Sequence, residues 1–243
     1  MKLRFQSVLH TVVMFLTPLT FLGTRDVRAQ VIYSNGFDSP VGPEWSLTTT
    51  SVTPVGGRTF LGEFVNQTAT LTLSSLPAHS QLTVSLDLFI IRTWDGNASG
   101  GGVGPDIWDL RVQGGPTLLH TTFQNPQNFF AGSGQAYPDA YPGGSHPSGT
   151  GAAEINTLGY NDQGALQLGP MDMVYKLSFT FPNGASSVAL NFSASGLETS
   201  NESWGFDNVV VAVPEPSSIG LCIIAAVGLS IGLHHKMSRC AAN

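Results

Sequence analysis

The sequence predicts an all-β protein, more specifically a two-sheet antiparallel β-sandwich. Apolar and polar residues alternate along most of the chain, which is the pattern of strands that bury one face. Glycine, proline and asparagine interrupt this alternation at short intervals, and the chain contains 28 glycines and 15 prolines in 243 residues. Nine or ten short strands separated by such turns are typical of a sandwich, and few segments have a helical pattern.

The longest predicted strand, 82–91, marks the centre of a sheet. Leu82, Leu86 and Ile90 share one apolar face, and the other face is polar until Phe89 and Ile91. A strand that is apolar on both faces at one end is expected to be covered on both sides there. The full set of expected strands is 31–33, 61–64, 69–73, 82–91, 108–112, 118–123, 175–181, 188–192 and 204–211.

Two turns are predicted from their own residues. Gly114-Gly115-Pro116 separates strands 108–112 and 118–123, and Pro182-Asn183-Gly184 separates 175–181 from a partner strand that begins at Val188. Residues 124–170 are the least regular part, with six glycines and three prolines within 131–151. A stretch of this length is either a functional or edge excursion or a disordered loop.

The charge of the central part excludes some partners. Residues 30–213 contain 14 acidic and 4 basic residues, a net charge of −10, compared with −6 for the whole chain. Such a field repels nucleic acid and anionic lipid and favours cation binding, so a nucleic-acid role is excluded. Both cysteines, Cys222 and Cys240, lie outside this part, so it has no disulfide framework.

Both ends of the chain have the features of export signals. Lys2 and Arg4 precede an apolar run and an A-x-A-like site at 27–29, which predicts a signal peptide over residues 1–29. At the other end, Pro214 and Pro216 stop the last strand. An uncharged segment, 219–233, then predicts a membrane helix, and a basic tail with Lys236 and Arg239 follows it.

The C-terminal triplet resembles the PEP-CTERM sorting signal of Gram-negative bacteria. The motif is Pro214, Glu215 and Pro216 within the segment 213–243, which leaves 30–212 as the β-sandwich domain. The resemblance implies processing by an exosortase after a transient stay in the inner membrane, and a destination at the cell surface or in a biofilm or exopolysaccharide matrix. An ordinary membrane anchor satisfies the same hydropathy rule.

The two ends of the domain resemble galactose-binding-like and related jelly-roll modules. Residues 33–38 with Trp45, and 204–209 near the C-terminal end, match the framing segments of such modules. The resemblance covers the frame only, and it implies a jelly-roll-like sandwich with structural calcium at Asp38 and Asp207. The alternative is that Asp38 caps a turn and Asp207 faces solvent.

Other candidate sites rest on residue type alone. The loop 94–106 carries Asp95, Asn97 and Asp106 but lacks the later glutamate of an EF-hand, and an acidic loop needs no metal. Aromatic residues stack on the apolar faces of sugars, so the candidate ligand-binding residues are Trp94, Tyr137, Tyr141 and Tyr160. Trp45, Trp108 and Trp204 lie in strand-like contexts and are expected in the core.

No catalytic motif is present. The chain lacks G-x-S-x-G, H-E-x-x-H and G-x-x-x-x-G-K-[ST]. Glu154, Glu198 and Glu202 could form a glycosidase pair only if the fold brings two of them together. We therefore expect an exported, non-enzymatic surface or matrix protein. The alternatives are a carbohydrate-binding, lectin-like module that binds extracellular polysaccharide, with or without calcium, and a secreted polysaccharide hydrolase.

The sorting signal predicts that the mature protein lacks the residues beyond the motif, because a recognised sorting helix is removed. Mass spectrometry of protein released from the cell surface is expected to find a C-terminus near Pro216. Replacing Pro214, Glu215 and Pro216 together with alanine is expected to leave the protein in the inner membrane. Intact Cys240-Ala241-Ala242-Asn243 in the released protein would contradict this prediction.

Overall fold

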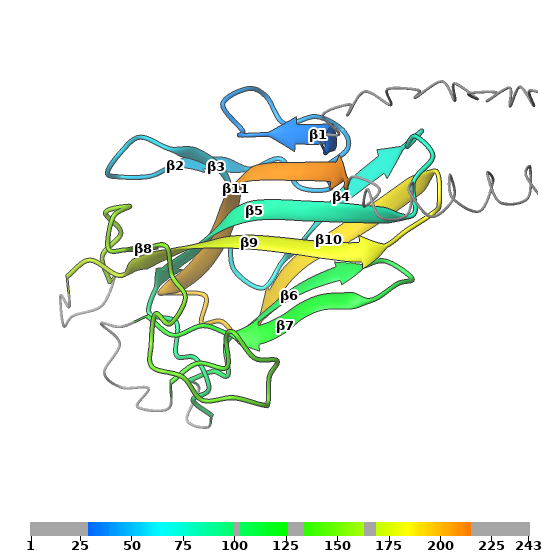
Figure 1. The fold of residues 1–243 in the computed structure, drawn as a ribbon. Coiled ribbons are helices and arrows are strands. Elements are labelled where there is room, and N and C mark those ends of the chain that lie inside the picture. The colour runs from blue at the N-terminus through cyan, green and yellow to red at the C-terminus, as the bar shows by residue number, and fades with distance from the viewer. Residues whose placement is uncertain (1–28, 100–102, 126–133, 163–168, 215–243) are drawn as a thin grey trace, which may run out of the picture.

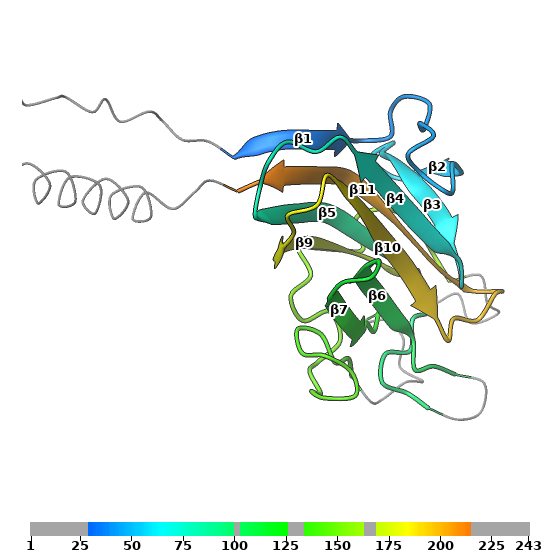
Figure 2. The same ribbon diagram turned by 90° about the vertical axis from the view of Figure 1, so that its right-hand side faces the viewer.

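The computed structural model describes residues 29–99, 103–125, 134–162 and 169–214, and these form two antiparallel sheets (Figures 1 and 2). The seven-stranded sheet has the order β2 (Thr50–Val52), β3 (Thr59–Phe64), β11 (Glu202–Val213), β5 (Gln81–Arg92), β9 (Asp172–Pro182) and β8 (Glu154–Ile155), and β1 (Gln30–Asn35) also pairs with β11. The four-stranded sheet has the order β4 (Thr68–Ser74), β10 (Ser187–Ser195), β6 (Ile107–Val112) and β7 (Thr117–Thr122). The predicted two-sheet antiparallel sandwich is confirmed.

The chain crosses from one sheet to the other several times. β3 belongs to the seven-stranded sheet and β4 to the four-stranded sheet, and the chain changes sheet again from β4 to β5 and from β5 to β6. The turn at 114–116 joins β6 and β7 as a hairpin, as expected. The predicted pairing across Pro182-Asn183-Gly184 is wrong, because β9 and β10 lie in different sheets and each pairs with other strands.

The core lies between the sheets and is rich in aromatic residues. Phe206 on β11 is completely buried, and its ring centroid lies 4.9 Å from that of Phe192 on the opposite sheet. Four more aromatic rings have centroids within 6.4 Å of Phe206, namely Phe37, Trp45, Phe64 and Trp204. The expectation that Trp45, Trp108 and Trp204 are core residues is confirmed.

A second, smaller core lies on the outer face of the seven-stranded sheet. Its buried members are Phe60, Phe89, Ile91, Leu158, Tyr160 and Val174. Leu158 and Tyr160 come from the segment between β8 and β9, which covers this end of the sheet. This cover explains why β5 is apolar on both faces at Phe89 and Ile91, as the sequence predicted.

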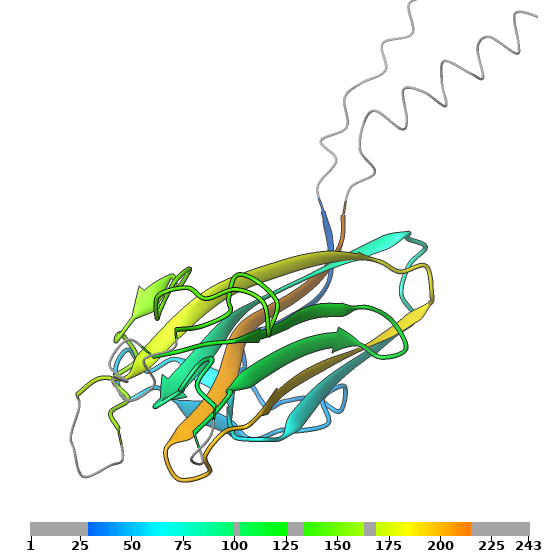
Figure 3. The same cartoon turned by 90° about the horizontal axis from the view of Figure 1, so that it is seen from below.

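The first and last described strands lie side by side, with Gln30 opposite Val213 (Figure 3). The predicted signal peptide, the apolar segment 219–233 and the motif residues Glu215 and Pro216 fall outside the described residues. Within the described part, no helix is long and apolar enough to cross a membrane.

Truncation of Phe206 tests the aromatic core. Phe206→Ala is expected to lower the free energy of unfolding by about 3–5 kcal/mol, because it removes a buried ring and leaves a cavity. For a chain of this size the melting temperature is expected to fall by roughly 6–20 °C. Val210→Ala, on the same strand but outside the core cluster, is the matched control. An equal, small effect of both substitutions would contradict the assigned centre of the core.

Candidate functional site

An open groove lies beside β2 and β3, next to the turn that follows β1. Its volume is about 440 Å³, and its lining residues are Phe37, Asp38, Ser39, Pro40, Val41, Thr48, Thr50 and Thr59. Asp38, Ser39 and Thr50 are exposed, whereas Phe37 belongs to the core and is only 2% exposed. The Asp38 groove therefore has a surface rich in hydroxyl groups, with the buried ring of Phe37 at its base.

The fold brings Asp38 and Asp207, the predicted metal residues, to the same place. A Cβ atom on Gly36 would lie 3.8 Å from Asp38 Oδ2 and Asp207 Oδ1 and 3.6 Å from Asn208 Oδ1. Three side-chain oxygen atoms thus lie around Gly36, each at ordinary van der Waals distance from a Cβ placed there. The alternative expectation, that Asp207 faces solvent, is wrong, because Asp207 is only 6% exposed.

A bulge in β11 creates this arrangement. Asp207 is opposite Asp87 on β5, and the next registered pair is Val210 with Ser85, so β11 contains one extra residue here. Asn208 has a φ of 53°, which asparagine adopts more readily than most residues. Its Nδ2 atom donates to Asp87 Oδ2 at 3.0 Å, and its backbone N–H donates to Asp207 Oδ1 at 2.6 Å.

Asp38, Asp87 and Asp207 form a group that we call the outer carboxylate cluster. Basic side chains compensate part of its negative charge. Arg58 Nη2 lies 3.5 Å from Asp87 Oδ2, and Lys176 Nζ lies 3.8 Å from the same oxygen. The pKa of Asp207 is nevertheless raised to about 6, mainly by burial and also by the charges of Asp87 and Asp38, which outweigh the opposing effects of the Asn208 N–H and Arg58. Like charges opposite each other on adjacent strands require such partners.

A second group of carboxylates lies inside the protein, and we call it the buried carboxylate cluster. It consists of Asp95, Asp106 and Glu202, which are 4%, 0% and 2% exposed. Each offers one oxygen, and these oxygens lie within 4.8 Å of one another. Asp95 follows β5, Asp106 precedes β6, and Glu202 begins β11, so three elements from both sheets supply the cluster.

Burial controls the ionisation of this cluster. It raises the pKa of both Asp106 and Glu202 far above that of an ordinary carboxyl group, and the charge of Asp106 raises the pKa of Glu202 further, whereas a hydrogen bond with Glu202 lowers that of Asp106. Asp95 and Glu198 add further negative charge. Two backbone N–H groups oppose the effect, because Asp95 N donates to Asp106 Oδ2 and Glu198 N donates to Glu202 Oε2.

The sequence identified only part of this cluster. Asp95 and Asp106 belong to the acidic loop already noted, but Glu202 lies about 100 residues away and was considered only as a glycosidase carboxylate. Of the proposed glycosidase residues, Glu154 pairs with Arg58, and Glu202 is buried beside Asp106. The signal that points to Glu202 is its position as the first residue of β11 (Glu202–Val213), which enters the core.

Two of the four predicted sugar-stacking residues are buried. Trp94 is 0% exposed and donates its indole N–H to Ser203 O at 2.8 Å, so it has no free face. Tyr160 is 5% exposed and packs in the outer core, with the Arg92 guanidinium carbon 5.1 Å from its ring centroid. The expectation that these two rings are exposed is wrong, because the segments around them fold back onto the sandwich.

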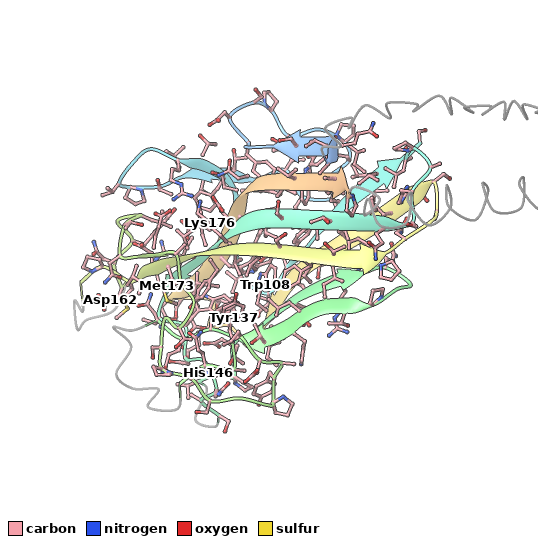
Figure 4. The ribbon with its side chains drawn as sticks, in the orientation of Figure 1. Trp108, Tyr137, His146, Asp162, Met173 and Lys176 are labelled. Atoms are coloured by element: carbon pink, nitrogen blue, oxygen red, sulfur yellow. The ribbon has the colours of Figure 1, made fainter. Side chains whose placement is uncertain are left out.

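The other two, Tyr137 and Tyr141, are half-buried in the irregular segment and do not line the Asp38 groove. Tyr137 packs on Phe123 and Tyr175, with ring centroids 5.1 and 5.2 Å away. Figure 4 shows Tyr137 on the side of the irregular segment that is nearer the sandwich, with His146 farther out. A role of Tyr137 and Tyr141 in ligand binding stays a prediction.

Buried polar side chains hold the described part of the irregular segment in place. Gln135 is completely buried, and its amide donates to the backbone oxygens of Tyr137 and Thr150 at 3.2 and 3.0 Å. Asp172 is also completely buried and accepts three backbone N–H groups, from Leu158, Gly159 and Tyr160. Of the two readings of this segment, the excursion fits the described residues better than the disordered loop does.

Comparison with known proteins assigns no family. No family model matches the chain, and no curated protein is similar to it. Among solved structures, the chain is similar to latent PorU from Porphyromonas gingivalis, with 13% identity, a TM-score of 0.40, and coverage of 79% of this chain and 13% of that one. It is similar to the CBM22-1 xylan-binding domain of Xyn10C from Paenibacillus barcinonensis, with 11% identity, a TM-score of 0.35, and coverage of 79% and 100%. It is also similar to the module CBM6cm-2 of lichenase 5A from Cellvibrio mixtus, solved with cellotriose, with 12% identity, a TM-score of 0.33, and coverage of 76% and 100%.

The raised pKa values predict that stability falls with rising pH when a chelator is present. Asp106 and Glu202 lose their protons near about pH 4 in an unfolded chain, whereas the folded values are about 8 and about 9. The contribution of these two groups to the free energy of unfolding is therefore complete below pH 4, and it is lost as the pH rises through their pKa values in the folded protein. Urea unfolding of the full-length protein in EDTA is expected to give a lower free energy at pH 8 than at pH 5, with a smaller difference in Glu202→Gln. An equal difference in both proteins would contradict the assignment.

Proposed function

We propose that the sandwich is a carbohydrate-binding module of an exported protein and that extracellular polysaccharide binds in the Asp38 groove. The groove carries this proposal, because five of its eight lining residues have hydroxyl or carboxylate oxygens. These groups exchange hydrogen bonds with sugar hydroxyls. The apolar atoms of Phe37, Pro40 and Val41 provide contact area for the C–H faces of a sugar ring, and the volume is in the usual range for ligand sites.

The charge of the domain favours a neutral glycan. The 14 acidic and 4 basic residues in 30–213 produce a negative field that disfavours uronic-acid or sulfated polymers. Asp38 in the groove adds a local negative charge that accepts hydrogen bonds and repels anions. A neutral polysaccharide is therefore the substrate class that this surface fits best.

A non-enzymatic role fits the groove better than hydrolysis. Glycoside hydrolysis uses a pair of carboxyl groups on either side of the scissile bond. Among the residues that line the groove, Asp38 is the carboxylate, and Ser39, Thr48, Thr50 and Thr59 supply hydroxyl groups. The proposed module binds the polymer and leaves it intact.

The position of the groove suits a protein attached at its chain ends. Gln30 and Val213 are opposite each other at one end of the β1–β11 pair, and the groove begins at Phe37, beyond the other end of β1. Six residues of β1 separate the two by about 20 Å. After export through the predicted signal peptide, the groove would therefore point away from the inner membrane until exosortase processing at Pro214, Glu215 and Pro216.

Calcium at Asp38 and Asp207 and the jelly-roll-like class belong to the same proposal. The ion would be held by the Asp38, Asp207 and Asn208 oxygens around Gly36, next to the groove, and would fix the turn that carries Asp38. The repeated change of sheet between β3 and β6 is the type of connection expected of a jelly-roll-like sandwich.

Binding to neutral polysaccharides tests the proposal. The full-length protein is expected to bind one or more neutral glycans on an array. Asp38→Asn is expected to raise the dissociation constant roughly ten- to hundredfold by removing charge-assisted hydrogen bonds. Thr59→Val is expected to raise the dissociation constant roughly two- to tenfold by removing a neutral hydrogen bond.

The control is Thr117→Val, because Thr117 lies at the exposed edge strand β7 of the other sheet. It is expected to bind as the wild type does. Equal binding by all four proteins would contradict the site, and release of reducing ends from the bound glycan would assign a hydrolase instead.

A further inference from the structure

The buried carboxylate cluster lies where two crossings between the sheets meet. Residues 93–106 lead from β5 in the seven-stranded sheet to β6 in the four-stranded sheet, and residues 196–201 lead from β10 back to β11. The crossings are in direct contact, because a Cβ on Gly196 would lie 2.2 Å from Pro105 O. Asp95 and Asp106 belong to the first crossing, and Glu202 directly follows the second as the first residue of β11.

Two oxygens of this cluster have no partner. Asp106 Oδ1 and Glu202 Oε1 are buried and accept no hydrogen bond from the described part of the chain. Both belong to side chains that are at least 98% buried. A buried carboxylate oxygen without a hydrogen bond or counterion costs several kcal/mol of stability, so a positive group bound by these oxygens would stabilise the fold.

No basic residue of the domain remains to supply that charge. The sequence between 30 and 213 contains four, Arg58, Arg92, Arg111 and Lys176. Their ion pairs are all with carboxylates outside the cluster. Arg58 and Lys176 contact Asp87, Arg58 also contacts Glu154, Arg92 contacts Glu63, and Arg111 contacts Asp109.

The three carboxylates fit a single hard cation. Calcium binds oxygen at about 2.3–2.6 Å, so oxygens up to about 5 Å apart can share one ion, and here they lie within 4.8 Å of one another. A backbone oxygen lies close by, because a Cβ on Gly104 would be 2.9 Å from Ala98 O and 3.4 Å from Asp106 Oδ1. All these donors are oxygens, which is the preference of calcium and magnesium and not of zinc or copper.

We propose that Asp95, Asp106 and Glu202 bind one calcium ion, which joins the two crossings and closes this end of the sandwich. The ion takes the place of a disulfide in a domain without cysteine. It is separate from the site expected at Asp38 and Asp207, and it does not depend on glycan binding. Without the ion, a proton shared by Asp106 and Glu202 would reduce the repulsion between their negative charges instead.

Calcium binding and thermal unfolding of the full-length protein test this proposal. Calcium at a hundredfold excess over its dissociation constant is expected to raise the melting temperature by about 5–10 °C relative to EDTA. Magnesium is expected to have a smaller effect, because it requires a more regular octahedral site. No saturable calcium binding to the wild type would overturn the proposal.

Glu202→Gln separates the ion from the shared proton. The variant is expected to lose one equivalent of calcium in isothermal titration and the corresponding rise in melting temperature. In EDTA it is expected to be at least as stable as the wild type, because the new amide N–H can donate to Asp106 Oδ1. A calcium response equal to that of the wild type would overturn the assignment of the ligands.

Two comparisons complete the test. Asp207→Asn, in the outer carboxylate cluster, is expected to retain the binding step that Glu202→Gln removes, and Asp139→Asn, on the exposed side of the irregular segment, is expected to retain all steps.

If Glu202→Gln does not fold, calcium binding to the wild type tests the proposal. Its calcium affinity is expected to be higher at pH 8 than at pH 6, because the ion displaces protons. Absence of calcium binding at both pH values would leave the shared proton as the explanation.

Discussion

The pairing of β5 with β11 is the constraint on which the rest of the structure depends. It runs from Glu202 opposite Arg92 to Ala212 opposite Thr83, and β9 continues it along the whole of β5. The inner faces of the three strands form one wall of the aromatic core. The same pairing fixes the position of both carboxylate clusters. Glu202 of the buried cluster begins β11, and Asp207 of the outer cluster lies at the bulge that interrupts the pairing of β11 with β5. One strand thus connects the core, the base of the groove and the buried cluster.

The local structure could be predicted because it depends on residues that are close together in sequence. The alternation along 82–91 and 204–211 required strands, and the apolar change at Phe89 and Ile91 required a cover on the outer face, which Leu158 and Tyr160 provide. The partners of each strand could not be read in the same way. A turn such as Pro182-Asn183-Gly184 is compatible with a hairpin and with a crossing between sheets, and the choice depends on which distant strands complete the core.

The candidate sites show the same difference between what the sequence predicts locally and what depends on distant segments. Asp38 and Asp207 were found because a resemblance links two segments far apart in sequence, and the fold does bring them together around Gly36. Trp94 and Tyr160 were misplaced because residue type alone does not distinguish an exposed ring from a buried one. Glu202 was not connected to Asp95 and Asp106, because only the contact between two crossings makes them neighbours.

The distribution of charge explains why the two carboxylate groups differ. With four basic residues for 14 acidic ones, the domain cannot pair every carboxylate with a side chain. Arg58 and Lys176 lie on the outer face of the seven-stranded sheet, where water can reach them, and there they offset Asp87. At the buried cluster the two crossings are in close contact at Gly196 and Pro105, which disfavours the volume of a long basic side chain there. A small ion supplies the same charge without that volume, and its binding depends on the surroundings, so this end of the sandwich would be most stable where calcium is plentiful.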